Sequence, residues 1–329
     1  MSAPLLEIRG LKTHFATDDG ILQAVDGVDL VIAPGETVGM VGESGCGKTV
    51  TALSILKLIA MPPGRIVDGQ IFWQGRDLVP LRMQDMNEIR SKQIAIVFQE
   101  PMTSLNPVYT VGAQIAEVVR RHEGLSRRAA LAKTVEMLRL VQIPNPQRRV
   151  HDFPHQFSGG MRQRVMIAMA LSCSPKLLIA DEPTTALDVT IQAQILELLQ
   201  DLKSRFSMAI MLITHAMGVV AETAQRVVVM YAGKVIEEAP VEQLFGRPRH
   251  PYTQGLIRSI PRLDRAATRK TRLEAIAGVV PSLINPPAGC RFAPRCRFAA
   301  PLCWEALPPL REIEPGHKVA CVRAEIIAQ

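Results

Sequence analysis

The segment that most constrains the fold is the run from Gly42 to Thr49, which reads GESGCGKT. It matches the phosphate-binding loop pattern G-x-x-x-x-G-K-[ST] at every fixed position. An apolar run over 37–41 precedes it and an amphipathic segment over 50–59 follows it. Glycines let backbone N–H groups curl around a phosphate, and a helix N-terminus adds its dipole. The pattern therefore predicts a nucleoside triphosphate site between a strand and a helix of an α/β fold.

Each residue type in this loop has a predicted task. We expect the Lys48 ammonium to reach the β- and γ-phosphates and the Thr49 hydroxyl to bind Mg²⁺. Phe15, upstream of the loop, is a candidate to stack on an adenine ring, and an ordinary core or hairpin aromatic is the alternative. The predicted nucleotide-binding residues of the loop are Gly42, Glu43, Ser44, Gly45, Cys46, Gly47, Lys48, Thr49 and Val50.

The length, charge and apolar pattern of the chain indicate how many domains it has and which kinds of partner it binds. A length of 329 residues predicts one large domain with an appendage. The formal net charge of +7 favours an anionic partner, either nucleic acid or a membrane surface, although solvated basic patches also explain it. No run of about 18 apolar residues occurs, so we expect no membrane-spanning helix. The N-terminal segment lacks a secretory pattern, and we therefore expect reduced cysteines rather than disulfides.

Polar side chains follow three predicted strands. The apolar run 177–180 ends at Asp181 and Glu182, which predicts a Mg²⁺-binding aspartate and a water-activating glutamate. Gln99 follows the predicted strand 94–98, and His215 follows the predicted strand 209–213 as a candidate γ-phosphate contact. Ligands of open α/β sheets bind at the carboxyl ends of strands. Solvated strand ends are the alternative, which the buried character of 177–180 disfavours.

The region between these strands changes to a helical pattern over about 104–160, which predicts a helical insertion in the α/β core. At its end, Ser158 is a good helix N-cap, and Gly159 and Gly160 leave the helix start open to a phosphate. Beyond residue 245 the composition shifts towards proline, arginine and short apolar pieces. We therefore predict an ATPase-type domain over 1–245 and a separate C-terminal domain over 246–329.

Six motifs stand in one order along residues 5 to about 245: the phosphate-binding loop, Gln99, the run SGGMRQ from Ser158, the strand end at Asp181 and Glu182, Ala186-Leu187-Asp188, and His215. That order resembles the ATP-binding subunits of ABC transporters. The resemblance implies ATP and Mg²⁺ as ligands and ATP hydrolysis coupled to transmembrane transport. It also implies the ABC-type nucleotide-binding fold, with a mixed sheet core, a helical subdomain and, here, a small irregular C-terminal appendage.

The resemblance also assigns roles residue by residue. It implies a nucleotide sandwich between two subunits, in which Ser158 and Gly160, with Gly159 between them, contact the γ-phosphate held by the other subunit. Asp188 is then the acid that crosses the interface. The remaining implied roles are Glu182 as general base, His215 as switch histidine, Lys48 as catalytic lysine, Gln99 as the link to the membrane domains, Thr49, Gln99 and Asp181 as Mg²⁺ ligands, and Phe15 as the adenine-stacking residue.

One position departs from the family pattern. Ala216 follows the switch histidine, where relatives commonly carry an acid. We expect this departure to affect how firmly His215 is held in place and, through it, the rate of ATP turnover. Because the other catalytic residues remain, we expect a competent ATPase.

Three further segments narrow the resemblance. The runs 250–256 (HPYTQGL) and 278–293 are similar to the tail of the dipeptide/oligopeptide transporter group, which also contains nickel and glutathione importers. The run FSGGMRQR over 157–164 resembles the D-type ATPase of that group. The resemblance implies an F-type ATPase partner in a heterodimer, two transmembrane permeases and an extracytoplasmic substrate-binding protein.

Four of the six cysteines gather in the tail, with five, six and seventeen residues between successive members. Four thiolates in such a tail favour a metal centre over disulfides. The spacing matches neither the usual zinc ribbon nor a bacterial ferredoxin. Relatives in the peptide-transporter group carry a [4Fe–4S] cluster here, so the resemblance implies a cluster, with zinc or merely reduced cysteines as alternatives. The four predicted ligands are Cys290, Cys296, Cys303 and Cys321.

Taken together, the sequence predicts an ATPase subunit of a peptide-type ABC importer, peripheral on the cytoplasmic face of the inner membrane and without a nucleic-acid partner. The alternative, suggested by the basic charge, is a soluble ABC ATPase that acts on nucleic acid or ribosomes. Such proteins usually carry two cassettes or a coiled-coil insert, and this chain has one phosphate-binding loop and no such insert.

Overall fold

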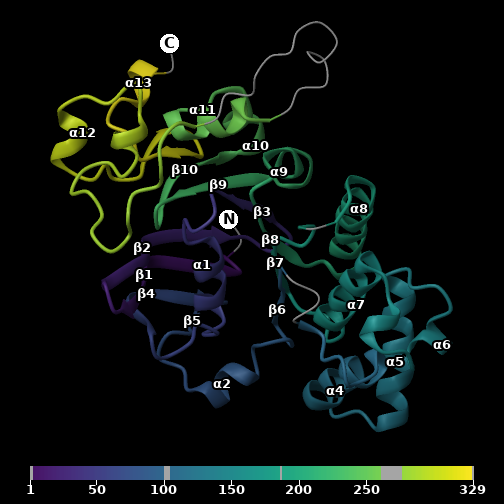
Figure 1. Cartoon of the computed structure of the whole chain (residues 1–329). Coiled ribbons are helices and arrows are strands. Elements are labelled where there is room, and N and C mark those ends of the chain that lie inside the picture. Colours follow the sequence, from purple (N-terminus) through teal and green to yellow (C-terminus); the bar gives the residue numbers. More distant parts are fainter. Residues whose placement is uncertain (1–2, 100–103, 186, 261–275, 328–329) are drawn as a thin grey trace, which may run out of the picture. The chain divides into compact units, whose positions relative to one another are not determined.

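The computed structural model describes residues 3–99, 104–185, 187–260 and 276–327 (Figure 1). The chain forms two compact units, each built from three separate segments. The first unit comprises Met1–Ala3, Ala33–Glu36 and Pro80–Ile213. The second comprises Pro4–Ile32, Thr37–Val79 and Thr214–Gln329.

The second unit contains an antiparallel sheet in the order β2-β1-β4-β5. Along β1, buried residues alternate with more exposed ones, as expected for a strand with one face on the core. The bounds of these strands are β1 (Leu6–Thr17), β2 (Gly20–Ile32), β4 (Gly64–Trp73) and β5 (Arg76–Asp77).

The same unit contains a group of mixed strands that carries the phosphate-binding loop. Strand β3 (Thr37–Val41) is parallel to β9 (Arg226–Tyr231), and β9 forms a hairpin with β10 (Lys234–Pro240). Every residue of β3 is buried, which is typical of a strand covered on both faces. Two strands of the C-terminal tail extend this group, because β12 (His317–Val319) pairs with β10 and β11 (Arg311–Glu314) pairs with β12.

The C-terminal tail of the second unit shares its hydrophobic core with β9. Tyr231 on β9, Tyr252 on α11 and Phe292 pack together with ring centroids 4.7–5.5 Å apart. This compact unit continues across residue 245, and the domain boundary near that position stays a prediction. The helices of the unit are α1 (Lys48–Ile55), α9 (Met217–Thr223), α10 (Val241–Gly246), α11 (Pro251–Arg258), η3 (Ala293–Arg295), α12 (Leu302–Glu305) and α13 (Ala324–Ile327).

The first unit has a parallel sheet. Strand β6 (Ile94–Val97) pairs with β7 (Leu177–Asp181), and β7 pairs with β8 (Ala209–Thr214). The helices that connect these strands include the block over α4 to α7, where Thr110, Ser126 and Ser158 each cap a helix with a side-chain oxygen. The helices of this unit are α2 (Met83–Asn87), α4 (Val111–Glu123), α5 (Arg127–Leu140), α6 (Pro146–Arg149), η1 (Pro154–Gln156), α7 (Gly159–Leu171) and α8 (Val189–Phe206).

The observed architecture agrees with the predicted fold class, because both units combine helices with strands and the strands around β9 are mixed in direction. The tail has more regular structure than the sequence suggests: β11 and β12 are short and pair with each other, and β12 also pairs with a distant strand, β10. Among the described residues, no helix is long and apolar enough to cross a bilayer.

Candidate functional site: a phosphate-binding loop and a strand-end carboxylate

The phosphate-binding loop follows β3 and needs glycine at two positions. Gly42 has φ 154°, and a Cβ there would lie 2.2 Å from the Met230 carbonyl oxygen. Gly47 has φ 103°, and a Cβ there would lie 2.4 Å from the Ala24 carbonyl oxygen. Both distances are far below any real Cβ contact, so a side chain at either position would displace the loop. The fixed glycines of the motif are therefore explained by the strands that pack against the loop.

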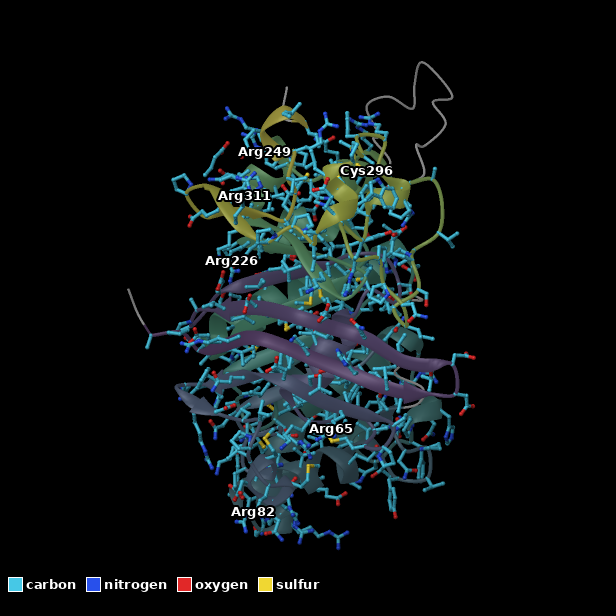
Figure 2. All side chains as sticks on the ribbon, turned by 90° about the vertical axis from the view of Figure 1, so that its left-hand side faces the viewer. Arg65, Arg82, Arg226, Arg249, Cys296 and Arg311 are labelled. Carbon is cyan, nitrogen blue, oxygen red and sulfur yellow. The ribbon has the colours of Figure 1, made fainter. Side chains whose placement is uncertain are left out.

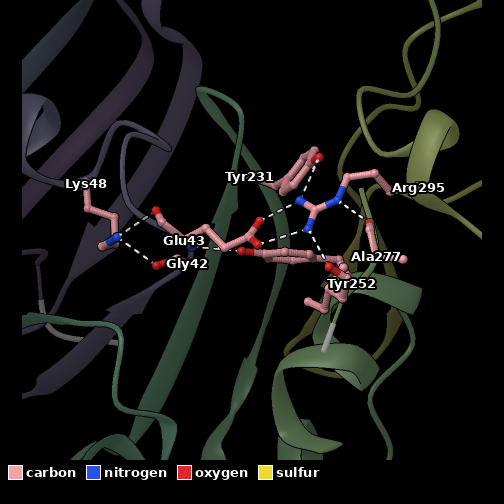
Figure 3. A network of polar contacts seen from close by, with 8 residues as sticks. Gly42, Glu43, Lys48, Tyr231, Tyr252, Ala277 and Arg295 are labelled. Carbon is pink, nitrogen blue, oxygen red and sulfur yellow. Dashed lines mark hydrogen bonds and ion pairs between the residues drawn. The ribbon is translucent and has the colours of Figure 1, made fainter. Parts of the chain in front are cut away.

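The start of α1 is arranged to receive an anion. Gly47 is its N-cap and supplies no side-chain hydrogen bond, and the first turn contains no acidic residue. A helix start of this kind presents backbone N–H groups and the positive end of the helix dipole, which suit a phosphate. Lys48 is buried, and its ammonium donates to the carbonyl oxygens of Gly42 at 2.7 Å and Glu43 at 3.0 Å (Figure 3). Ser44, Gly45 and Thr49 are exposed.

The Glu43 side chain points into the C-terminal tail, which the sequence did not predict. Its carboxylate accepts two hydrogen bonds from Arg295, at 2.7 and 3.0 Å, and its backbone N–H donates to the Tyr252 hydroxyl at 2.8 Å (Figure 3). The Glu43 carboxylate raises the pKa of Arg295. Burial lowers the pKa of His250 to about 4, so its neutral Nδ1 accepts from the Tyr252 N–H.

The first unit presents the two carboxylates at the end of β7. Asp181 is buried, and Glu182 accepts hydrogen bonds from Gln99 Nε2 at 3.0 Å and from Thr185 Oγ1 at 2.8 Å. The backbone of Glu182 has φ 47°, a left-handed conformation that is uncommon for residues other than glycine. Backbone strain of this kind gathers at functional sites, where the surrounding structure holds it in place.

Two helix starts of the first unit lie together. Ser158 caps α7 by accepting from the Met161 N–H at 3.4 Å, and Asp188 caps α8 by accepting from the Ile191 N–H at 2.9 Å. A Cβ on Gly160 would lie 2.8 Å from Ile191 Cγ2, so the second glycine lets the two helices approach each other. Ala186, the first residue of the predicted Ala-Leu-Asp motif, lies outside the described residues.

The remaining predicted residues lie in the second unit. Phe15 is half-buried on β1, where its ring packs on Gly64, since a Cβ on that glycine would lie 2.7 Å from the ring. His215 is exposed and follows β8. Ala216 is the N-cap of α9 and offers no side-chain hydrogen bond to the helix. Val50 belongs to α1.

The four cysteines of the tail line one small pocket together with His250, Phe292 and Phe298. Cys303 is buried, the other three are half-buried, and none forms a disulfide. Cys296 lies among the C-terminal elements in Figure 2. Burial raises the pKa of Cys321 to about 11 and also raises the pKa of Cys290 and Cys296. Within the described part of the chain, no group of three or more metal-binding side chains is placed to hold a metal ion.

Comparison with known proteins agrees with these observations. The family model described as "ABC transporter" matches residues 25–185, and the model described as "Oligopeptide/dipeptide transporter, C-terminal region" matches residues 236–303. The chain is 57% identical to "Probable peptide ABC transporter ATP-binding protein y4tR" of Sinorhizobium fredii, over 97% of this chain and 95% of the relative. It is 52% identical to "Oligopeptide transport ATP-binding protein OppD" of Bacillus subtilis, over 96% and 87% respectively.

Among solved structures, the chain resembles the ATP-binding cassette MJ0796, described as a dimeric post-hydrolysis state bound to ADP and Pi. The TM-score is 0.64 at 26% identity, covering 72% of this chain and 98% of that one. These relatives favour a transport ATPase over the nucleic-acid alternative. A match at 57% identity over nearly the whole chain, with the phosphate-binding loop in place, shows that the chain belongs to the ATP-hydrolysing subunits of the oligopeptide/dipeptide ABC transporter family.

Proposed function

We propose that this chain powers peptide import by hydrolysing ATP with Glu182 as the general base. The observation that carries the proposal is the fixed position of the Glu182 carboxylate, held by Gln99 and Thr185 at the end of a buried strand. A general base must be aimed at its water, and two hydrogen bonds from side chains restrict its rotamers. The names of the relatives, which refer to peptides, support the cargo class.

The loop binds the triphosphate of ATP in this proposal. Backbone N–H groups from Gly42 to Val50 surround the phosphates, and Lys48 exchanges its carbonyl partners for the β- and γ-phosphate oxygens. Its present hydrogen bonds to the loop support this, because they keep the ammonium beside the loop's own backbone. Thr49, Gln99 and Asp181 bind Mg²⁺, His215 contacts the γ-phosphate, and Phe15 stacks on the adenine.

The second ATPase subunit binds at the exposed starts of α7 and α8. Ser158, Gly159 and Gly160 then reach the γ-phosphate held by the partner's loop, and Asp188 crosses the interface. Val189 supports this location, because it is an apolar side chain that is 83% exposed beside Asp188. The proposed partner is an F-type ATPase, and the complex also contains two permeases, which sense closure through Gln99, and an extracytoplasmic binding protein. The chain is peripheral on the cytoplasmic face of the inner membrane.

We further propose that the tail, residues 246–329, is a distinct functional region next to an ATPase domain over 1–245 with a helical subdomain over about 104–160. The tail carries the metal centre. The donor set fits a [4Fe–4S] cluster or zinc in kind, since four thiols without disulfides line one pocket. Cys290, Cys296, Cys303 and Cys321 would hold the group, and the raised pKa values of Cys290, Cys296 and Cys321 mean that binding releases protons. A bound group would cross-link separate parts of the tail, which has few strands, and so stabilise its fold.

Transport in a reconstituted complex tests the main proposal. The chain is purified with its permeases and partner ATPase, placed in proteoliposomes with ATP, and assayed for uptake of a labelled peptide mixture. We expect uptake with the wild-type chain and none with Glu182→Gln. Salt-sensitive binding of the purified chain to nucleic acid, without uptake of any peptide, would instead support the alternative function.

Metal analysis tests the cysteine site. Anaerobically purified full-length chain is assayed for iron, acid-labile sulfide and zinc, with an absorption spectrum. About four irons and four sulfides per chain indicate the cluster, and about one zinc indicates the zinc alternative. Cys296→Ser should lose the metal, whereas the control Cys173→Ser, outside the pocket, should keep it. A metal-free wild-type protein contradicts both proposals.

A further inference from the structure

The turn between Cys290 and Cys296 contacts the phosphate-binding loop directly through Arg295, and Arg291 binds a residue next to one that contacts the loop. Arg295, directly before Cys296, pairs with Glu43 of the loop (Figure 3). Arg291, directly after Cys290, donates to the Ala232 carbonyl oxygen, and the neighbouring Gly233 N–H donates to the Cys46 carbonyl oxygen at 2.9 Å. One turn of the tail is therefore linked to the loop directly at Glu43 and indirectly, through Ala232 and Gly233, at Cys46.

Arg295 uses all five of its guanidinium hydrogens in this arrangement. Nε donates to the Ala277 carbonyl oxygen, and the terminal nitrogens donate to the Glu43 carboxylate, the Ile276 carbonyl oxygen and the Tyr231 hydroxyl. Its side chain is only 3% exposed. A planar guanidinium with fixed donors holds a carboxylate in one orientation, which a lysine ammonium does not do. Arg295 therefore fixes the direction of the Glu43 side chain.

The ion pair between Arg295 and Glu43 also changes the charge that a bound triphosphate meets at the loop. Glu43 lies inside a loop that receives a polyanionic triphosphate, and an unpaired carboxylate there repels it. The Arg295 guanidinium compensates that charge on the side of Glu43 that faces away from Lys48 (Figure 3). The Tyr252 hydroxyl accepts from the Glu43 N–H and so holds the backbone of the same residue.

We propose that Arg295, with Tyr252 and Arg291, positions the phosphate-binding loop for ATP, so that the Cys290–Cys296 turn is a structural part of the nucleotide site. The inference rests on the proposed role of the loop as the ATP site. It makes Arg295 a positioning residue, which acts on ATP through Glu43. A change in the conformation of the Cys290–Cys296 turn therefore alters ATP affinity through these three side chains.

ATP binding to the full-length chain, measured by calorimetry with Mg²⁺ well below the melting temperature, tests the proposal. We expect Arg295→Met to weaken ATP binding about 10-fold, because Glu43 keeps its charge and loses its partner. Arg295→Lys should restore part of the loss. The matched control is Arg297→Met, two residues along the chain, where the guanidinium lies over the Phe298 ring and not on the loop; its affinity should equal that of the wild type.

The double variant Glu43→Gln/Arg295→Met separates compensation of the Glu43 charge, through which Arg295 acts on ATP, from a general loss of stability. Removing both charges should return ATP affinity to within about 3-fold of the wild type, because no carboxylate remains to repel the phosphates. Equal affinities of Arg295→Met and the wild type would overturn the proposal, as would a double variant as weak as Arg295→Met. Failure of the wild-type chain itself to bind ATP would overturn the proposed function instead, so the two failures are distinguishable.

Discussion

The phosphate-binding loop and the turn at Glu182 are supported in different ways. The loop is held by distant parts of the second unit, through Tyr252 and Arg295, and its lysine is buried. The Glu182 carboxylate is held by Thr185, three residues along the chain, and by Gln99, which follows β6, and the backbone of Glu182 is in a left-handed conformation. The loop is therefore held in place by contacts from its own unit. At Glu182, by contrast, the backbone is strained and the carboxylate is half-buried.

This difference predicts that the loop mainly determines ATP affinity and that Glu182 mainly determines the rate of hydrolysis. A receptor for a polyanion gains affinity from preformed donors, which the loop supplies with its backbone N–H groups and Lys48. A general base needs an accurate position relative to water and contributes to the transition state more than to substrate binding. Changes in the loop should therefore mainly alter ATP affinity, and changes at the turn should mainly alter turnover.

The largest expected effect is at the turn. Glu182→Gln keeps the size and hydrogen-bonding capacity of the side chain but cannot accept the proton from water. We expect single-turnover ATP hydrolysis in the assembled complex to fall about 10³-fold, with ATP affinity unchanged within about 2-fold. Rapid-quench measurements give the rate, and calorimetry gives the affinity. Unchanged single-turnover hydrolysis would refute the assignment of the base.

The next largest effect is in the loop. Lys48→Ala removes the buried ammonium, and we expect ATP affinity to fall about 30-fold, since a hydrogen bond to a charged group contributes about 1.5–3 kcal/mol. Equilibrium binding of ATP with Mg²⁺ measures this effect. The melting temperature serves as the control for folding. A variant that keeps wild-type affinity but loses turnover contradicts the separation of binding from chemistry.

The smallest expected effect tests whether Thr185 orients the Glu182 carboxylate. Thr185→Val removes the hydroxyl that donates to Glu182 at 2.8 Å, and one hydrogen bond contributes about 1 kcal/mol. We expect hydrolysis to slow about 5-fold without a change in ATP affinity. Ser204→Ala, on the exposed face of α8, is the control within the same unit. Equal rates for the two variants show that Thr185 does not orient the base.

Several features were predictable from the sequence because their causes are local. The loop glycines, the lysine and the strand that precedes them are contiguous, and Ser158 and Asp188 cap their helices through residues three positions away. The strand 177–181 is apolar and ends at its two acids, so β7 and its end follow from the pattern alone. The roles of these residues in catalysis stay predictions that the proposed experiments test.

Other features were decided by the tertiary structure because their partners are distant in the sequence. Arg295 and Glu43 are 252 residues apart, and Tyr252 and Glu43 are 209 residues apart. Neither periodicity nor motif spacing carries information on such pairs, since they form only when β9, α11 and the cysteine turn pack together. By itself the sequence therefore determined where the phosphate-binding loop lies and which chemistry it serves. Only the fold decided that the C-terminal tail supports it, because the buried Arg295 guanidinium needs a carboxylate partner and the packed core brings Glu43 within reach.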